Sequence, residues 1–221
     1  MNTINGDKIY FDKDFKVEDL EFLGSGANAK VYKIKIEDKC YALKIFSEYE
    51  LWKDSWLEDK LDLNLESFIG PLKLVYINDI FCGYIMEYFK TKTILEENPK
   101  LSIDEIVLHS LKLYEDTDKL SEKQIIIQDE GVKNTVFENG FKLIDLDHYY
   151  KCPLKGYFKN LDIIKDFNRQ IITRLLINIY FHSVGLDGIC YEDDKLKEKR
   201  DECLEGKMSL EDFLKNIACK I

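Results

Sequence analysis

Three oxygen-bearing side chains in the second half of the chain could together hold a metal ion and activate a hydroxyl group. Asp129 and Asn134 lie five positions apart, and Asp145 follows them. Residues 135–146 predict a hairpin, because Asn139-Gly140 is the strongest kind of two-residue turn signal. Such a hairpin brings Asn134 and Asp145 to one end, where amide and carboxylate oxygens suit Mg²⁺. Asp129 beside them could orient an attacking hydroxyl or accept its proton.

A lysine in the first half of the chain could neutralise negative charge. Lys44 lies inside the apolar segment 40–46, which predicts a strand. A lysine in such a strand must be paired, because desolvating an unpaired charge is costly. The helix expected next supplies Glu58, which lies late enough in that helix to face the strand. A purely structural salt bridge is the alternative to a catalytic pair.

Two glycines precede this strand. Gly24 and Gly26 belong to the segment Gly-Ser-Gly-Ala-Asn-Ala, which ends at Ala29 between two expected strands. Glycines at such a turn let backbone N–H groups approach phosphate oxygens. A plain hairpin turn is the alternative. The segment is neither a Walker A motif nor a Rossmann fingerprint, since no helix follows it.

Composition narrows the classes of partner. The 221 residues include 32 Lys+Arg and 42 Asp+Glu, a net charge of −10, which argues against nucleic acid or an anionic membrane as the main partner. The N-terminus lacks the apolar segment of a signal peptide, and no apolar stretch is long enough to span a bilayer. The six cysteines form no Cys-x-x-Cys pair, which is typical of reduced thiols. We therefore expect a cytoplasmic protein without a membrane span.

Alternating apolar and polar residues predict a strand-rich first lobe over residues 1–89. Ser47 and Glu50 fit a capping box, so a helix is expected from Ser47 to about Leu63. Five strands are expected, over residues 18–24, 29–36, 40–46, 72–78 and 81–89.

The second lobe, residues 90–221, is expected to be mostly helical. Its helices are predicted over residues 102–118, 160–182, 194–207 and 209–220. The chain therefore reads as an α+β protein whose two lobes form one domain around one cleft.

The order of these features resembles the protein-kinase fold over about residues 18–181. The motifs that carry the resemblance are the glycine-rich loop at 24–31, the strand lysine at 42–44 with Glu58 as its helix partner, the gatekeeper and hinge at 85–89, the catalytic loop at 127–134, the Asp-Leu-Asp motif at 145–147 in place of Asp-Phe-Gly, and Asp166 of the central helix. The resemblance implies a bilobal fold with a five-stranded antiparallel sheet and one helix in the first lobe. It also implies a truncated helical second lobe, as in compact bacterial-type kinases.

The resemblance further implies an enzyme that moves the γ-phosphate of Mg·ATP to a hydroxyl acceptor, with ATP and Mg²⁺ as cofactors. It assigns catalytic roles to Asp129, Lys44, Glu58 and Lys133. It assigns nucleotide contacts to Gly24, Ser25, Gly26, Ala29, Val31, Ala42, Lys44, Met86, Glu87, Phe89 and Val136. It assigns the metal to Asn134, Asp145 and Asp147.

Several positions depart from the kinase pattern. Gln128 replaces an arginine and Leu146 replaces a phenylalanine. Asp147 replaces a glycine, and it either adds a second metal carboxylate or faces water. No Ala-Pro-Glu motif lies between Asp145 and Asp166, so the peptide-docking platform is reduced or missing.

These departures leave the acceptor open. A protein serine or threonine hydroxyl is the family default, and a sugar, a lipopolysaccharide or another small molecule is the alternative. A nucleotide-binding pseudokinase, which would switch a partner without catalysis, is the competing class because it explains the replaced residues.

Overall fold

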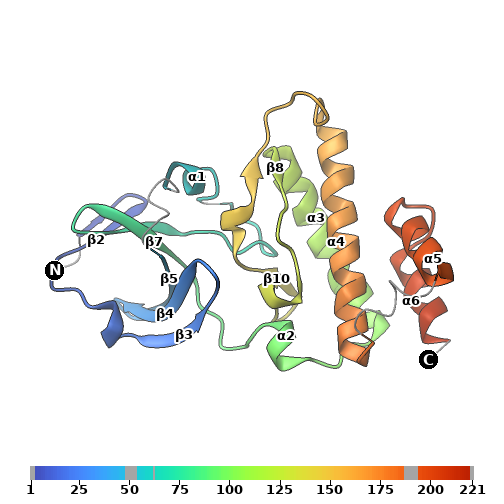
Figure 1. The fold of residues 1–221 in the computed structure, drawn as a ribbon, viewed down its shortest axis with the longest axis horizontal. Coiled ribbons are helices and arrows are strands. Elements are labelled where there is room, and N and C mark those ends of the chain that lie inside the picture. The colour runs from blue at the N-terminus through green and yellow to red at the C-terminus, as the bar shows by residue number, and fades with distance from the viewer. Residues whose placement is uncertain (1–2, 48–53, 62, 187–193, 220–221) are drawn as a thin grey trace. The chain divides into compact units, whose positions relative to one another are not determined.

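The computed structural model describes residues 3–47, 54–61, 63–186 and 194–219 (Figure 1). These residues form two compact units. The first unit contains Met1–Asn64, Ile69–Lys90 and Asp145–Asp147, and the second contains Leu65–Phe68, Thr91–Ile144 and His148–Ile221. Leu65–Phe68 of the first half thus belongs to the second unit, and Asp145–Asp147 of the second half belongs to the first unit. The two units therefore do not correspond to a simple division of the chain near residue 90.

The first unit is built on a seven-stranded sheet. Its strands are β1 (Thr3–Asn5), β2 (Lys8–Phe11), β3 (Glu21–Ser25), β4 (Ala29–Ile36), β5 (Lys39–Phe46), β6 (Lys73–Ile77) and β7 (Ile80–Glu87). Their order in the sheet is β1-β2-β6-β7-β5-β4-β3. Neighbouring strands are antiparallel, except that β2 runs parallel to β6.

The predicted α+β class is confirmed, but the predicted count of five strands is wrong. The two additional strands, β1 and β2, form a hairpin around Gly6, which has a φ of 56°. The alternation of buried Ile9 and Phe11 with less buried Lys8 and Tyr10 is the local signal for β2. Its parallel pairing with β6 joins segments more than sixty positions apart, and no local pattern predicts that.

The main core of the first unit lies on one face of this sheet. Its buried members are Ile9, Phe11, Ile34, Leu43, Val75 and Ile85. The ring of Phe11 also stacks on Phe15, with 3.9 Å between their centroids. The N-terminal hairpin therefore contributes directly to the core.

The helix predicted over residues 47–63 is shorter in the described part of the chain. The short helix α1 covers Asp54–Glu58, and turns follow at residues 59–61. The predicted capping box lies partly on Glu50, outside the described residues. The Ser47 hydroxyl donates to the carbonyl of Asn28 at 3.1 Å, and the N–H groups that it was predicted to cap lie outside the described residues.

The second unit is mostly helical. Its elements include α2 (Ile94–Glu97), α3 (Ile103–Glu122), β8 (Ile125–Ile126), the 3₁₀ turn η2 (Val132–Asn134), β9 (Thr135–Phe137), β10 (Phe141–Leu143), β11 (Tyr150–Lys151), α4 (Leu161–Val184), α5 (Asp194–Leu204) and α6 (Leu210–Ala218). The hairpin predicted around Asn139-Gly140 is β9–β10. No helix among the described residues is long and apolar enough to cross a membrane.

The helices of this unit begin at polar caps. The Ser102 hydroxyl accepts from the Glu105 N–H at 3.2 Å, and the Glu105 carboxylate accepts from the Ser102 N–H at 2.8 Å. At α4 the Asn160 side chain accepts from the Ile163 N–H. These bonds satisfy N–H groups that have no partner within the helix, which is why the helix starts could be predicted locally.

The role of β2 in the core can be tested with Phe11→Ala. Phe11 is 2% exposed, so its removal should lower the free energy of unfolding by about 3–5 kcal/mol. Ile80→Ala is the matched control, because Ile80 is 57% exposed and should change stability by no more than about 0.5 kcal/mol. Urea denaturation measures both. Equal stability of the two variants would contradict the place of β2 in the core.

Candidate functional site

Lys44 lies at the middle of the sheet. Its strand, β5, pairs with β4 on one side and β7 on the other, where Lys44 lies opposite Val31 and Tyr84. Leu43 points into the core, so the alternation of a strand sends Lys44 to the opposite face. The lysine is only 7% exposed.

The ammonium of Lys44 is bonded to two carboxylates of the same unit. Its Nζ donates to Oδ1 of Asp145 in a very short bond and to Oδ1 of Asp147 at 2.7 Å. The rings of Phe46 and Tyr84 lie 5.6 and 5.9 Å from Nζ, within the range of cation–π attraction. We name Lys44, Asp145 and Asp147 the Lys44 cluster.

Burial and charge set the pKa values of this cluster. Burial lowers the pKa of the Lys44 ammonium, but the charges of Asp145 and Asp147 outweigh this effect and raise it above its ordinary value. Burial raises the pKa of Asp145 to about 6, and its hydrogen bond with Asp147 acts in the same direction against the attraction of Lys44. Two carboxylates share one ammonium, so one negative charge remains uncompensated within the cluster when both are ionised.

The predicted pair of Lys44 and Glu58 does not form. Glu58 is exposed, and its carboxylate lies 3.9 Å from Nζ of Lys8. Sequence reasoning sought the partner of Lys44 in the next helix, whereas the fold brings in carboxylates from about one hundred positions further along the chain. Asp147 does not face water as one alternative had it, because it is 3% exposed and bonded to Lys44. The other alternative, a second metal carboxylate, stays a prediction.

A glycine that sequence reasoning missed lets the strands meet at Lys44. Gly83 of β7 lies opposite Ile45, and a Cβ atom on it would stand 1.9 Å from the carbonyl oxygen of Lys44. Any side chain there would push β7 away from β5. Tyr84, also missed, is fully buried beside the cluster, and this burial together with the charges of Asp147 and Asp145 raises its pKa well above the ordinary value.

The other predicted nucleotide contacts of the first unit lie on four strands, in the β3–β4 turn and just after β7. Gly24 and Ser25 end β3, Ala29 and Val31 belong to β4, Ala42 belongs to β5, and Met86 and Glu87 end β7, with Phe89 after it. Gly26 closes the β3–β4 turn by donating to the Ala29 carbonyl at 2.9 Å. A Cβ on Gly24 or Gly26 would meet nothing within 4 Å, so packing imposes no need for glycine there.

The remaining predicted residues belong to the second unit. Nζ of Lys133 lies 3.2 Å from Oδ1 of Asp129, and both side chains are exposed. The Asn134 side-chain amide donates to the Asp129 backbone carbonyl at 2.7 Å. Val136 is buried in β9. These contacts stabilise the loop, although an exposed ion pair contributes only about 0–1 kcal/mol.

Asn168, which sequence reasoning did not single out, holds the segment before that loop. Its side chain accepts from the Ile127 N–H at 3.0 Å and donates to the Ile125 carbonyl at 2.8 Å and to the Ser121 hydroxyl at 2.9 Å. The sequence signal that could have identified it is an amide at helical spacing from Ile164 and Ile171, on the apolar face of the expected helix.

The predicted metal ligands are therefore divided between units. Asp145 and Asp147 belong to the first unit and Asn134 to the second. Both carboxylates are bonded to Lys44. Within the described parts of the chain, no three His, Cys, Asp or Glu side chains gather closely enough to hold a metal ion.

Comparison of the sequence with known proteins finds a family other than the protein kinases. Residues 7–70 match the family described as kinetochore Sim4 complex subunit FTA2. The match covers β2 through α1 and ends at Gly70, which is less than half of the chain. No curated protein matches the chain.

This match overturns the resemblance to protein kinases and the assignment that rested on it. The matched family is one of kinetochore subunits and not of kinases. The predictions of an ATP-dependent phosphotransferase, of a sugar or small-molecule kinase and of a pseudokinase switch are therefore wrong. Three of the residues that suggested them gather in the Lys44 cluster, whose contacts are those of a buried ion group in the sheet.

The raised pKa of Asp145 predicts a specific dependence of stability on pH. Between pH 3.8 and about 6 the unfolded chain releases this proton while the folded chain retains it. The contribution of Asp145 to the free energy of unfolding should thus fall as the pH rises through this window, and stay constant above it. Asp145→Asn cannot titrate, so the stability of wild type minus that of the variant should fall across the window in urea denaturation. A difference that stays constant from pH 4 to pH 6 would contradict the assignment.

Proposed function

We propose that the chain is a protein-binding subunit of a multiprotein complex, of the kind named by the matched family, and that the edge strand β3 forms part of its binding surface. The observation that carries the proposal is the exposure of β3. Phe22 is 56% exposed and Leu23 is 39% exposed on the last strand of the sheet. Both residues lie within the matched segment 7–70.

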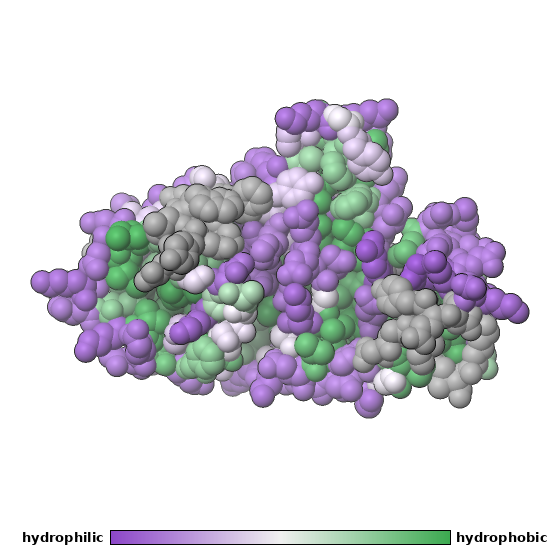
Figure 2. All heavy atoms as spheres, in the orientation of Figure 1, coloured by the Kyte–Doolittle hydropathy of each residue, from purple (hydrophilic) through white to green (hydrophobic). Residues whose placement is uncertain are grey.

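The chemistry of an edge strand favours this role. In the described chain β3 pairs with β4 alone, so the backbone groups along its other edge are available to a strand of another protein. Edge strands usually avoid such pairing through charge, proline or a cover, whereas β3 presents two apolar side chains in its middle. Figure 2 shows apolar side chains of the first unit reaching the surface between hydrophilic ones.

The proposal needs no catalytic step. The Lys44 ammonium is bonded within its own unit, where it stabilises the face of the sheet opposite the main core. The acidic net charge of −10 favours protein over DNA as the direct contact. The proposal places the chain in a kinetochore complex and replaces the general cytoplasmic location expected from the cysteines.

The surface can be tested in the full chain with the double variant Phe22→Lys/Leu23→Lys. A tagged wild-type chain, purified from its native cells, should recover kinetochore subunits. The amount of these subunits recovered with the variant should be lower by roughly tenfold or more, because apolar anchors at interfaces contribute about 2 kcal/mol or more to binding. Ile80→Lys makes the same chemical change at another exposed position of the unit and should bind as wild type does.

Each failure has a distinct meaning. Recovery of no kinetochore subunit by the wild-type chain would overturn the proposed function. Equal recovery by wild type and the β3 variant, with unchanged melting temperatures, would overturn β3 as the surface.

Binding of Mg²⁺, alone or together with ATP, is a separate proposal, and the surplus negative charge of the Lys44 cluster favours the cation. A bound Mg²⁺ would neutralise the charge that Asp145 and Asp147 carry beyond that of Lys44. Mg²⁺ or Mg·ATP should then raise the melting temperature of the wild-type chain, since a ligand at one hundred times its Kd stabilises by about 2.7 kcal/mol. Asp145→Asn should lose the shift. No shift with either ligand would remove this proposal and leave the protein-binding proposal in place.

A further inference from the structure

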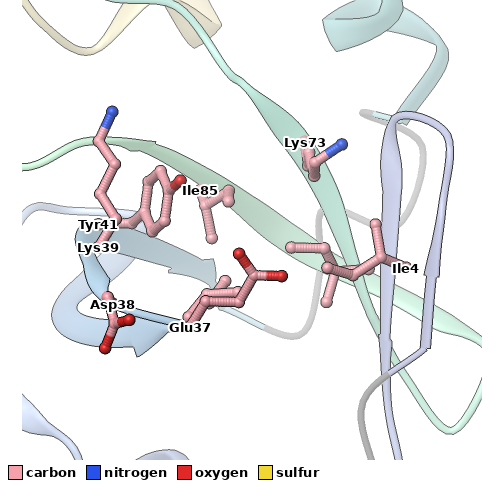
Figure 3. A pocket seen from close by; sticks show the side chains of 9 residues that line it. Ile4, Glu37, Asp38, Lys39, Tyr41, Lys73 and Ile85 are labelled. Atoms are coloured by element: carbon pink, nitrogen blue, oxygen red, sulfur yellow. The ribbon is translucent and has the colours of Figure 1, made fainter.

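A pocket of about 490 Å³ opens in the first unit, and none of the Lys44 cluster residues lines it (Figure 3). Its volume lies within the range of about 300–1,000 Å³ that is typical of ligand sites. Nine residues line it: Ile4, Ile9, Ile36, Glu37, Asp38, Lys39, Tyr41, Lys73 and Ile85. Six of them, from Ile9 to Tyr41, lie within the segment that matches the kinetochore family.

Five of the nine residues that line the pocket are isoleucines or a tyrosine, and the other four are charged. Ile9 and Ile85 are members of the buried core, and Ile36 and Tyr41 pack against it. Ile4 is exposed. A ligand with an apolar part would therefore bury that part against side chains whose positions the core already holds.

Among the charged side chains around the pocket, one exposed carboxylate has no ion-pair partner within the described residues. Lys73 donates to the Gly6 carbonyl at 2.6 Å, and Nζ of Lys39 lies 5.4 Å from the centroid of the Tyr41 ring. In Figure 3 the ammonium groups of Lys39 and Lys73 point away from the pocket.

The carboxylates differ from each other. Asp38 lies 3.6 Å from Nζ of Lys35, which compensates its charge. The Glu37 carboxylate points into the pocket in Figure 3, and no described residue pairs with it. Glu37 also has a φ of 54°, a left-handed conformation that non-glycine residues rarely adopt.

We propose that this pocket binds a segment of a partner protein in which an arginine or lysine lies beside an apolar residue. The cationic head would meet the Glu37 carboxylate, and the apolar atoms would lie against Ile9, Tyr41 and Ile85. Arginine and lysine suit such a site because their methylene stems are apolar while their heads are charged. The inference rests on the proposed function as a protein-binding subunit and names the chemistry of its partner.

The test uses the full chain, labelled with ¹⁵N, and two short peptides, Gly-Leu-Arg-Leu-Gly and Gly-Leu-Gln-Leu-Gly. The arginine peptide should shift the amide signals of Ile9, Ile36, Tyr41 and Ile85 in a saturable way, and the glutamine peptide should bind at least about fivefold more weakly. Glu37→Gln should weaken binding of the arginine peptide by a similar factor, and it should leave binding of the glutamine peptide unchanged. Such coupling in a double-mutant cycle assigns the cation to Glu37.

Matched controls make the result specific. Asp38→Asn changes the neighbouring carboxylate, which is already paired, and should alter binding less than twofold. A free amine, butylamine, is the second probe. Saturable binding of butylamine but not of the arginine peptide would overturn the assignment to a protein segment.

The failures of the two proposals are distinguishable. An arginine peptide that causes no saturable shift, or that binds the wild-type chain and Glu37→Gln equally, overturns the pocket proposal. The recovery of kinetochore subunits through β3 is measured independently of these peptides, so a negative peptide result leaves the proposed function standing. Loss of every protein partner would overturn both.

Discussion

The burial of the Lys44 ammonium is the constraint on which the first unit depends. A buried lysine in an interior strand of a sheet cannot leave its charge uncompensated in a dry environment. The chain meets this requirement with Asp145 and Asp147, although nearly all of its second half belongs to the other unit. Asp145–Asp147 of the second half are thus part of the first unit. The folded sheet depends on this loop after β10, because the loop supplies both carboxylates that are bonded to Lys44.

This constraint also explains why residue motifs pointed to the wrong chemistry. A buried lysine in a strand, a distant pair of acids and a glycine-bearing hairpin turn are what phosphate chemistry uses. They are equally what a sheet needs when it buries a charge and turns tightly. The contacts of Lys44 are with protein carboxylates, and the family that matches residues 7–70 is one of kinetochore subunits. Similar residues on a similar framework therefore do not by themselves assign a function.

The two surfaces of the first unit suit protein partners in complementary ways. Within the described residues β3 presents a backbone edge without a second strand, together with Phe22 and Leu23, and under our proposal this edge would recognise the extended shape of a strand. The pocket presents apolar side chains and the Glu37 carboxylate that points into it, which would recognise a particular side chain under our proposal. Backbone pairing supplies affinity with little selectivity, and a charged pocket supplies the selectivity.

The sequence by itself determined the elements whose causes are local. Alternation marked β4 and β5, Asn139-Gly140 marked the β9–β10 hairpin, and Ser102 marked the start of α3. Only the tertiary structure decided the parallel pairing of β2 with β6 and the partners of Lys44. Both join residues far apart along the chain, and the choice among many possible partners depends on how the whole sheet packs. Burial created the need for a carboxylate beside Lys44, but folding selected Asp145 and Asp147 and left Glu58 at the surface.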